Sequence, residues 1–279
     1  MYRQIIVIIA ITALCSLSFA PGKIKWVAIG DSITYLNDHL DETGHRVEKG
    51  YLTRVTEKLP DMAYVNKGYN GWTTGGIADK IDELGLEKAD VYSVFLGTND
   101  WWRGRPVGLM ADYENSTGSG TVYGAFRIII DKLRSLNDKA PIILITPLQR
   151  GDFVYIGNYK NNAYGSYSEK HGQALSDVVK AIQKIARKEK LEVIDLYHKS
   201  GINIKNMVRF KRLKDPATGQ YKNYPYPAYK KIPFDPENDE YPYPAEVAGM
   251  TYDGLHPSDK GNEIIADMLV NKMKSLQIP

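Results

Sequence analysis

Five short apolar runs alternate with longer segments in which apolar residues recur with a helical spacing. This alternation constrains most strongly what this chain of 279 residues can fold into. Apolar residues occupy both faces of these runs, as in strands of a parallel sheet that helices cover on both sides. The sequence therefore predicts an α/β fold with three layers, α/β/α, around a five-stranded parallel sheet. The expected strands cover residues 23–30, 62–68, 90–97, 141–147 and 191–197.

Helical segments are expected between these strands and after the last one. In residues 121–137 and 171–190 apolar side chains recur every three or four positions, which is typical of amphipathic helices. Pro257 is suited to the first turn of the final helix. The expected helices cover residues 50–59, 75–86, 121–137, 171–190 and 257–276.

Residues 200–252 interrupt this alternation, because they are rich in Tyr and Pro and have neither a helical nor a strand period. A disordered linker is one interpretation. Disordered segments are poor in aromatic residues, however, and a further helix follows directly. We therefore expect a single domain over residues 21–279, with an ordered insertion at about 200–252 lying over one end of the sheet.

Residues 1–20 have the plan of a secretory signal peptide: Arg3, an apolar stretch and then small residues. The apolar stretch is short for a transmembrane helix, and no later stretch is longer, so no stable membrane span is expected after its removal. Cys15 is the only cysteine, so the mature chain can form no disulfide and has no thiol nucleophile. Leu14 is too large for a good lipoprotein signal, although lipid anchoring stays open. We expect a periplasmic or extracellular protein.

Charge and histidine spacing exclude other classes of protein. The formal net charge is +3 with scattered lysines, which gives no support to nucleic-acid binding. No H-E-x-x-H motif or phosphate-binding glycine loop is present, and the remaining histidines have no metal-ligand spacing. No metal or other cofactor is expected.

Polar residues follow three of the expected strands and precede the last helix. Ser32 follows the first strand, Gly71 the second and Asn99 the third, whereas Asp253 and His256 lie near the carboxyl terminus. Each has an ordinary explanation as a turn, cap or surface residue. In parallel sheets, however, sites form at the carboxyl ends of the strands, where these residues are expected.

Together these residues meet the chemical needs of ester cleavage. Ser32 can attack a carbonyl, His256 can take and return the proton, and Asp253 can orient the imidazole. The backbone N–H groups of Ser32 and Gly71 and the side-chain amide of Asn99 can stabilise the oxyanion. A glycine suits this role because no Cβ separates its N–H from the substrate.

The same residues occur in four blocks that resemble the SGNH hydrolase family, also called GDSL esterases and lipases. The resemblance covers about residues 24–272. It implies a flavodoxin-like fold and a metal-free Ser-His-Asp mechanism, with Asp31 as a support residue beside the nucleophile. The blocks, in the family's order, are GDSIT with Ser32, NGWT with Gly71, GTND with Asn99, and DGLHP with Asp253 and His256.

Three rival interpretations fit less well. An α/β-hydrolase needs G-x-S-x-G, but Thr34 occupies the position of the second glycine. A metallophosphoesterase would need an aspartate where Thr34 stands. A carbohydrate-binding protein on an inactive hydrolase scaffold would have lost at least one of the residues needed for ester cleavage. All five of these residues are present: Ser32, Gly71, Asn99, Asp253 and His256.

Aromatic residues beside the predicted site suggest a substrate. Trp72, Trp101 and Trp102 follow the Gly71 and Asn99 loops directly, so we expect them to flank the cleft. Aromatic faces with polar tips suit stacking on sugar rings, so we hypothesise an esterase that removes short acyl groups, such as acetyl, from a glycan. Packing of the insertion onto the domain would also explain the aromatics; a lysophospholipase, lipase-type or broad short-chain acylhydrolase is the main alternative. The insertion would add Tyr224, Tyr226, Tyr229, Tyr241, Tyr243 and Tyr252.

Overall fold

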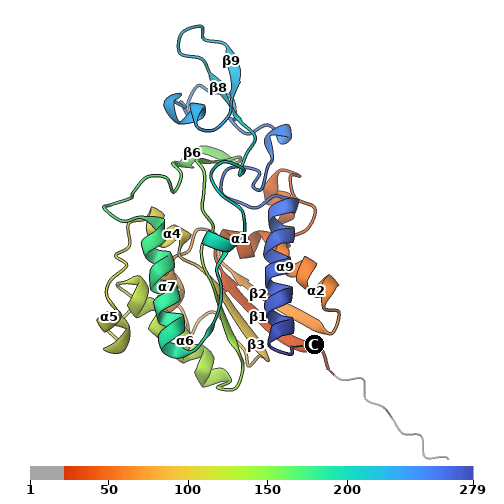
Figure 1. Ribbon diagram of the computed structural model, residues 1–279, viewed down its shortest axis with the longest axis vertical. Coiled ribbons are helices and arrows are strands. Elements are labelled where there is room, and N and C mark those ends of the chain that lie inside the picture. The colour runs from red at the N-terminus through yellow and green to blue at the C-terminus, as the bar shows by residue number, and fades with distance from the viewer. Residues whose placement is uncertain (1–21, 279) are drawn as a thin grey trace, which may run out of the picture.

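Five parallel strands form the central sheet in the order β2-β1-β3-β4-β7 (Figure 1). The computed structural model describes residues 22–278, so the expected signal peptide lies outside the described residues. The predicted fold class is confirmed, and the strand order is that of flavodoxin-like sheets. The strands are β1 (Ile24–Gly30), β2 (Met62–Gly68), β3 (Val91–Phe95), β4 (Ile142–Ile145) and β7 (Glu192–Ile194).

Strand β1 is buried on both faces because its side chains alternate between two apolar cores. Val27 and Ile29 pack into one core, whereas Trp26 and Ala28 pack into the other. This burial explains why the run in the sequence is continuously apolar rather than alternating.

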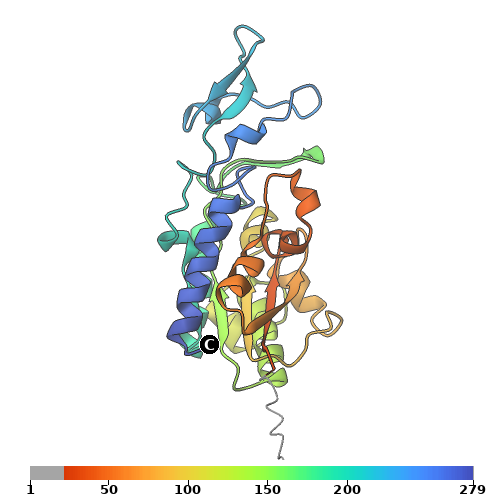
Figure 2. The same cartoon turned by 90° about the vertical axis from the view of Figure 1, so that its right-hand side faces the viewer.

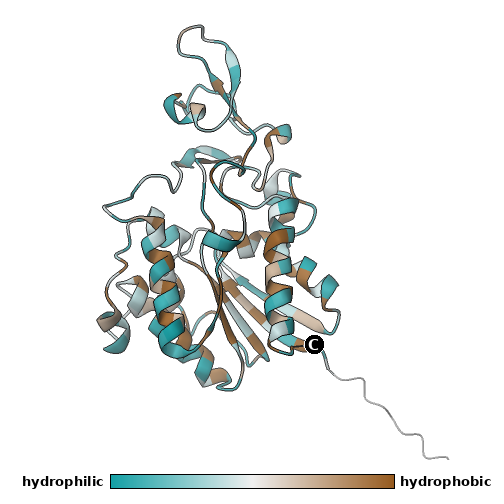
Figure 3. Cartoon of the chain, viewed as in Figure 1, coloured by the Kyte–Doolittle hydropathy of each residue, from teal (hydrophilic) through white to brown (hydrophobic). Residues whose placement is uncertain are grey.

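Two helical layers enclose these cores. One face of the sheet is covered by α3 (Thr74–Asp79), α6 (Val122–Leu136) and α7 (Leu175–Glu189), and the other by α2 (Tyr51–Lys58) and α9 (Asp259–Ser275). Apolar residues line the inner sides of these helices and hydrophilic residues the outer sides (Figure 3). None of the helices within residues 22–278 is long and apolar enough to cross a membrane.

Three helix boundaries differ by more than one residue from the sequence-based prediction. Helix α3 ends at Asp79 instead of continuing to residue 86, and the following residues form turns. Helix α7 begins at Leu175 rather than at residue 171. Pro257 lies before the helix, because the side chain of Ser258 caps α9 by accepting a hydrogen bond from Gly261 N.

A hairpin that the sequence did not predict lies between β4 and α7. Its strands are β5 (Phe153–Tyr155) and β6 (Asn158–Ala163), paired antiparallel. Strand β6 reads NYKNNA and has little apolar character, so periodicity could not reveal it.

The insertion at 200–252 lies over the carboxyl end of the sheet (Figures 1 and 2). It contains a second antiparallel hairpin, β8 (Lys211–Lys214) and β9 (Tyr221–Tyr224). The sequence shows no strand period here, because these four-residue strands are too short to produce a visible alternation. Buried Tyr229 and Tyr243 belong to a separate apolar cluster that packs the insertion together.

The remaining short helices connect these elements near the carboxyl ends of the strands or along the edges of the sheet. They are α1 (Ser32–Tyr35), α4 (Thr98–Trp102), α5 (Met110–Glu114) and α8 (Leu196–Lys199), with 3-10 turns at Leu36–Asp38, Leu40–Thr43, Ala228–Lys231 and Ala245–Val247.

Candidate active site

Ser32 is the first residue of α1, directly beyond the carboxyl end of β1. Asp31 caps this short helix, since its Oδ1 accepts a hydrogen bond from Ile33 N at 3.1 Å. Because β1 lies between β2 and β3, the chain leaves β1 at the point where the strand order reverses, which is where open α/β sheets place their sites. The buried strand thus presents the Ser32 hydroxyl at the carboxyl end of the sheet.

His256 and Asp253 reach Ser32 from the loop before α9. His256 Nε2 lies 2.9 Å from Ser32 Oγ, and His256 Nδ1 lies 2.7 Å from Asp253 Oδ2. Asp253 Oδ1 also accepts hydrogen bonds from the backbone N–H groups of Leu255 and His256, which hold its carboxylate in place. This relay has the geometry that a serine nucleophile and its base require.

A glycine makes this compact loop possible. Gly254 has φ +88°, and a Cβ at this position would lie 1.8 Å from Asp152 O. Only glycine fits there without displacing the backbone.

Two aromatic rings hold the His256 imidazole. Tyr252 stacks on it with ring centres 5.8 Å apart and an interplanar angle of 21°, and Phe153 meets it edge-on at 5.3 Å. Because both rings are almost completely buried, the imidazole has little freedom to turn away from Ser32.

Gly71 and Asn99 face Ser32 across one cavity of about 290 Å³, which His256 also lines. Gly71 has φ +74°, a conformation that favours glycine. Asn99 lies in the first turn of α4, and its Nδ2 donates a hydrogen bond to Trp72 O at 3.0 Å. That bond uses one of the two amide N–H groups and leaves the other for a ligand in the cavity.

Two buried charged side chains flank the relay, and burial shifts the pKa of each. Desolvation raises the pKa of Asp31 to about 6, against the smaller opposing effects of its hydrogen bond from Ile33 N and of His256. Desolvation lowers the pKa of Arg150 to about 10, and attraction to Asp253 opposes the shift. Arg150 therefore remains charged at neutral pH.

Among the aromatic residues expected at the cleft, the three tryptophans and Tyr252 divide into two pairs. Trp102 and Tyr252 line the cavity. Trp101 does not, because its indole is fully buried and donates a hydrogen bond from Nε1 to Gln173 O. The ring of Trp72 stacks on Tyr69 and packs against the core beside α3, outside the lining of the cavity.

The other five tyrosines expected at the cleft lie away from the cavity. Their rings belong to an apolar cluster that joins the insertion to Val154 and Tyr159 of the β5–β6 hairpin. The expectation that they join the cleft was wrong, and the alternative, that they pack the insertion, is what the structure shows for Tyr224, Tyr226, Tyr229, Tyr241 and Tyr243.

Several residues of the cavity wall were not identified from the sequence. Arg150 follows β4, and Phe153, Tyr155 and Asn161 belong to the β5–β6 hairpin. The placement of sites at the carboxyl ends of strands could have indicated Arg150. Nothing in the polar sequence of β6 indicates that it faces Ser32. The wall also includes Leu36, Glu42, Asn70, Arg103, Ala163 and Leu255.

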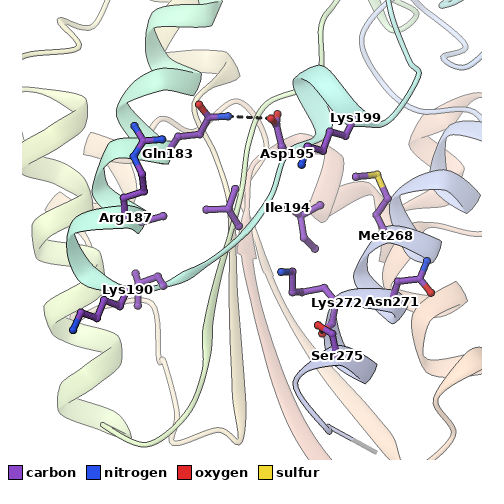
Figure 4. Close-up of a pocket in the computed structure, with 13 residues that line it drawn as sticks. Gln183, Arg187, Lys190, Ile194, Asp195, Lys199, Met268, Asn271, Lys272 and Ser275 are labelled. Atoms are coloured by element: carbon purple, nitrogen blue, oxygen red, sulfur yellow. Dashed lines mark hydrogen bonds between the residues drawn. The ribbon is translucent and has the colours of Figure 1, made fainter.

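A larger groove of about 850 Å³ lies beside β7, an edge strand of the sheet, between α7 and α9 (Figure 4). Gln183 donates a hydrogen bond to Asp195 across it, and Lys190 and Lys272 lie along its sides. None of the relay residues lines this groove, so we assign the chemistry to the smaller cavity. Within residues 22–278, no three His, Cys, Asp or Glu side chains are grouped as a metal site would require.

Fold and relay together define the class of an ester hydrolase with an α/β/α architecture. The sequence profile of the GDSL-like Lipase/Acylhydrolase family matches residues 28–264, and the chain belongs to this family. The resemblance drawn from the four sequence blocks is thus confirmed. A search of curated proteins finds no significant match.

Solved structures agree with this assignment. A possible lipase from Chitinophaga pinensis is 61% identical and superposes with a TM-score of 0.91, covering 92% of this chain and 100% of its own. A protein from Lactobacillus plantarum, at 22% identity and a TM-score of 0.62, covers 91% of this chain and 98% of its own. A lipase/acylhydrolase from Enterococcus faecalis, at 19% identity and a TM-score of 0.52, covers 91% and 96%. The last two show the shared fold alone.

Proposed function

We propose that Ser32 is the nucleophile of an ester hydrolase that removes short acyl groups, acetyl in particular, from a glycan. The observation that carries the catalytic part is the continuous relay from Ser32 Oγ through His256 to Asp253, with contacts of 2.9 Å and 2.7 Å. The glycan part is supported by the composition of the cavity wall.

The first half of the reaction forms an acyl-enzyme. Ser32 Oγ attacks the ester carbonyl while His256 Nε2 takes the hydroxyl proton, and Asp253 stabilises the resulting imidazolium. The carbonyl oxygen becomes an oxyanion that accepts hydrogen bonds from the Gly71 N–H, the Ser32 N–H and the Asn99 amide. Collapse breaks the ester C–O bond, and His256 gives its proton to the departing alcohol.

The second half releases the acid. A water molecule attacks the acyl-Ser32 carbonyl and gives a proton to His256 Nε2. The second tetrahedral intermediate then collapses, and Ser32 leaves with the proton that His256 returns. The enzyme is restored, and one water molecule has been consumed for one ester bond cleaved.

The wall of the cavity favours a short acyl group and a polar alcohol. Its aliphatic side chains are few (Leu36, Ala163 and Leu255), whereas Trp102, Tyr155 and Tyr252 provide aromatic rings. A volume of about 290 Å³ is at the small end of ligand sites, which leaves little room for a long acyl chain. Exposed amides at Asn70 and Asn161 can bond to sugar hydroxyls.

The test is a series of 4-nitrophenyl esters, from acetate through butyrate to octanoate, with wild type, Ser32→Ala and Ser135→Ala. Ser135 is an exposed serine of α6, outside the cavity. We expect kcat/KM to fall roughly tenfold or more from acetate to octanoate, to fall at least about 10⁴-fold in Ser32→Ala, and to be unaltered in Ser135→Ala.

Two outcomes would overturn parts of the proposal. Octanoate hydrolysed much faster than acetate would exclude the acetyl-glycan substrate and favour a lysophospholipase or lipase-type activity. Full activity in Ser32→Ala would exclude the serine mechanism. An active wild type would be screened next for acetate release from acetylated oligosaccharides.

Secretion is part of the same proposal. Residues 1–20 would be removed as a signal peptide, and the remaining chain would act as one domain in the periplasm or outside the cell. Mass spectrometry of the protein expressed in full should find a mature amino terminus near residue 21; an intact Met1 in the secreted fraction would contradict this.

A further inference from the structure

Arg150 has a charged side chain in the wall of the cavity, and this side chain has no hydrogen-bond or ion-pair partner within residues 22–278. It is 2% exposed, and it lines the same cavity as Ser32 and His256. Among the contacts within residues 22–278, its guanidinium donates no hydrogen bond and forms no ion pair, and its Nε is buried without an acceptor. Only its backbone is bonded, to Ser166.

Such an arrangement is unusual, because buried charges are normally paired and hydrogen-bonded. Aromatic rings account for part of the stabilisation: the guanidinium carbon lies 5.5 Å from the ring centres of Trp101 and Trp102 and 6.0 Å from that of Phe153. Rings attract the charge but accept no conventional N–H···O hydrogen bond in the guanidinium plane. The two terminal nitrogens, Nη1 and Nη2, are not among the fully buried unpaired atoms, so their N–H groups are the ones available to a ligand in the cavity.

The other charges of the wall set the charge of that ligand. Arg103 is exposed and lies beside Gly71, where a Cβ on the glycine would be 3.3 Å from its Nη2. Glu42 is the single carboxylate of the wall, and it accepts a hydrogen bond from Tyr35 Oη at 2.7 Å. Within the wall itself, two arginines and one glutamate leave one positive charge in excess. The carboxylates of Asp253, Asp152 and Asp31 also attract the Arg150 guanidinium from outside the wall, but none of them forms an ion pair with it, so a carboxylate in the cavity would be its direct partner.

We propose that Arg150 is a specificity-determining residue that binds a carboxylate on the alcohol portion of the ester, so that the enzyme deacylates acidic sugars. This inference rests on the proposed function, since it names the substrate class of the same site. A guanidinium matches the planar carboxylate with paired N–H donors, and the buried setting strengthens the bond. The carboxylate is remote from the reacting carbonyl, so its recognition should appear mainly in KM.

The experiment uses two acetate esters that differ by methylation of one carboxyl group, which removes its negative charge: 3-acetoxybenzoate and methyl 3-acetoxybenzoate. Release of acetate is the readout, because the methyl ester carries a second ester bond. For wild type we expect kcat/KM for the acid to exceed that for the methyl ester by at least about tenfold. In Arg150→Gln this ratio should fall to near one, mainly through the KM of the acid. Arg150→Lys, which keeps the charge but loses the planar fork, should give an intermediate ratio.

Arg187→Gln is the matched control, because it removes one arginine charge from the exposed face of α7, outside the cavity. In this variant the ratio of kcat/KM for the acid to kcat/KM for the methyl ester should equal that of wild type. A fall equal to that of Arg150→Gln would mean that the overall field of the protein, rather than Arg150, selects the anion, and would overturn the proposal.

A second measurement needs only wild type and therefore does not depend on the folding of a variant. Benzoate should inhibit hydrolysis of 4-nitrophenyl acetate competitively and at least about tenfold more strongly than benzamide. Equal inhibition by both would overturn the proposal.

The possible failures are distinguishable. If wild type cleaves both acetoxybenzoates equally well, with full dependence on Ser32, the hydrolase function holds and the carboxylate inference is wrong. If Arg150→Gln lowers kcat equally on both esters, Arg150 only positions the relay. If neither ester nor 4-nitrophenyl acetate is cleaved with dependence on Ser32, the proposed function fails and the inference fails with it.

Discussion

Asp100 and Thr74 join the two loops that carry the proposed oxyanion donors. The fully buried carboxylate of Asp100 accepts hydrogen bonds from Thr74 N at 2.9 Å and from Thr74 Oγ1 at 2.6 Å. Thr74 begins α3, three residues after Gly71, and Asp100 directly follows Asn99. The pair thus sets the spacing between Gly71 and Asn99 without touching the cavity.

Thr74→Val should therefore act on both stability and catalysis. Removing a hydroxyl bonded to a buried carboxylate is expected to lower the free energy of unfolding by about 1.5–3 kcal/mol and to lower kcat more than it changes KM. Denaturant titration and steady-state kinetics measure the two effects. Thr74→Ser keeps the hydroxyl and is the control; a Val variant as active as the Ser variant would show that the bond does not position the donors.

Asn99→Ala should lower kcat by about 10²–10³-fold with little change in KM, because the free amide N–H would act on the oxyanion and not on the ground-state ester. The variant also loses the bond to Trp72 O, so its thermal midpoint must be measured alongside. A raised KM with normal kcat would instead assign Asn99 to substrate binding.

The buried Asp31 carboxylate should reduce stability at neutral pH. Its pKa of about 6 lies above the ordinary value of 3.8, so between about pH 4 and 6 the folded state binds more protons than the unfolded state. The free energy of unfolding therefore falls as pH rises through this window, by up to about 3 kcal/mol.

Asp31→Asn should remove this dependence and raise the free energy of unfolding at pH 7.5, as urea titrations across pH 4 to 8 would show. It should also lower kcat, because the charge of Asp31 favours the His256 imidazolium. Asp177 provides a control of opposite sign: its pKa is lowered, with the bond from Lys180 among the causes, so Asp177→Asn should not stabilise the protein. Destabilisation by Asp31→Asn at pH 7.5 would contradict the expected sign.

Asp152 and Lys211 form a largely buried ion pair, 3.2 Å apart, between the segment after β4 and the insertion. Burial lowers the pKa of Lys211, against the attraction of Asp152. Asp152→Asn leaves this ammonium without its counter-charge and should cost about 3–5 kcal/mol of stability. In the double variant Asp152→Asn with Lys211→Met the loss should be smaller than the sum of the single losses, as urea titrations would show. Additive losses would mean that the pair does not link the insertion to the domain.

Local sequence was sufficient for the sheet and its order of elements. Strand β1 is recognisable as a continuous apolar run because both of its faces are buried. Helix α7 is recognisable by apolar residues every three or four positions because one of its sides is buried. The same holds for the candidate relay: Ser32, Asp253 and His256 lie in short motifs at the ends of elements, where the topology of a parallel sheet brings chain segments together.

Burial and the wall of the cavity were decided by tertiary structure. Trp101 and Trp102 are neighbours in the sequence, yet one is fully buried and the other faces the cavity, because α4 turns them in different directions. Arg150 acquires its significance only when the polar β5–β6 hairpin and the rings of Trp102 and Phe153 enclose it. Periodicity records which face of an element is apolar, but the absence of a partner for a buried charge depends on every segment that folds over it.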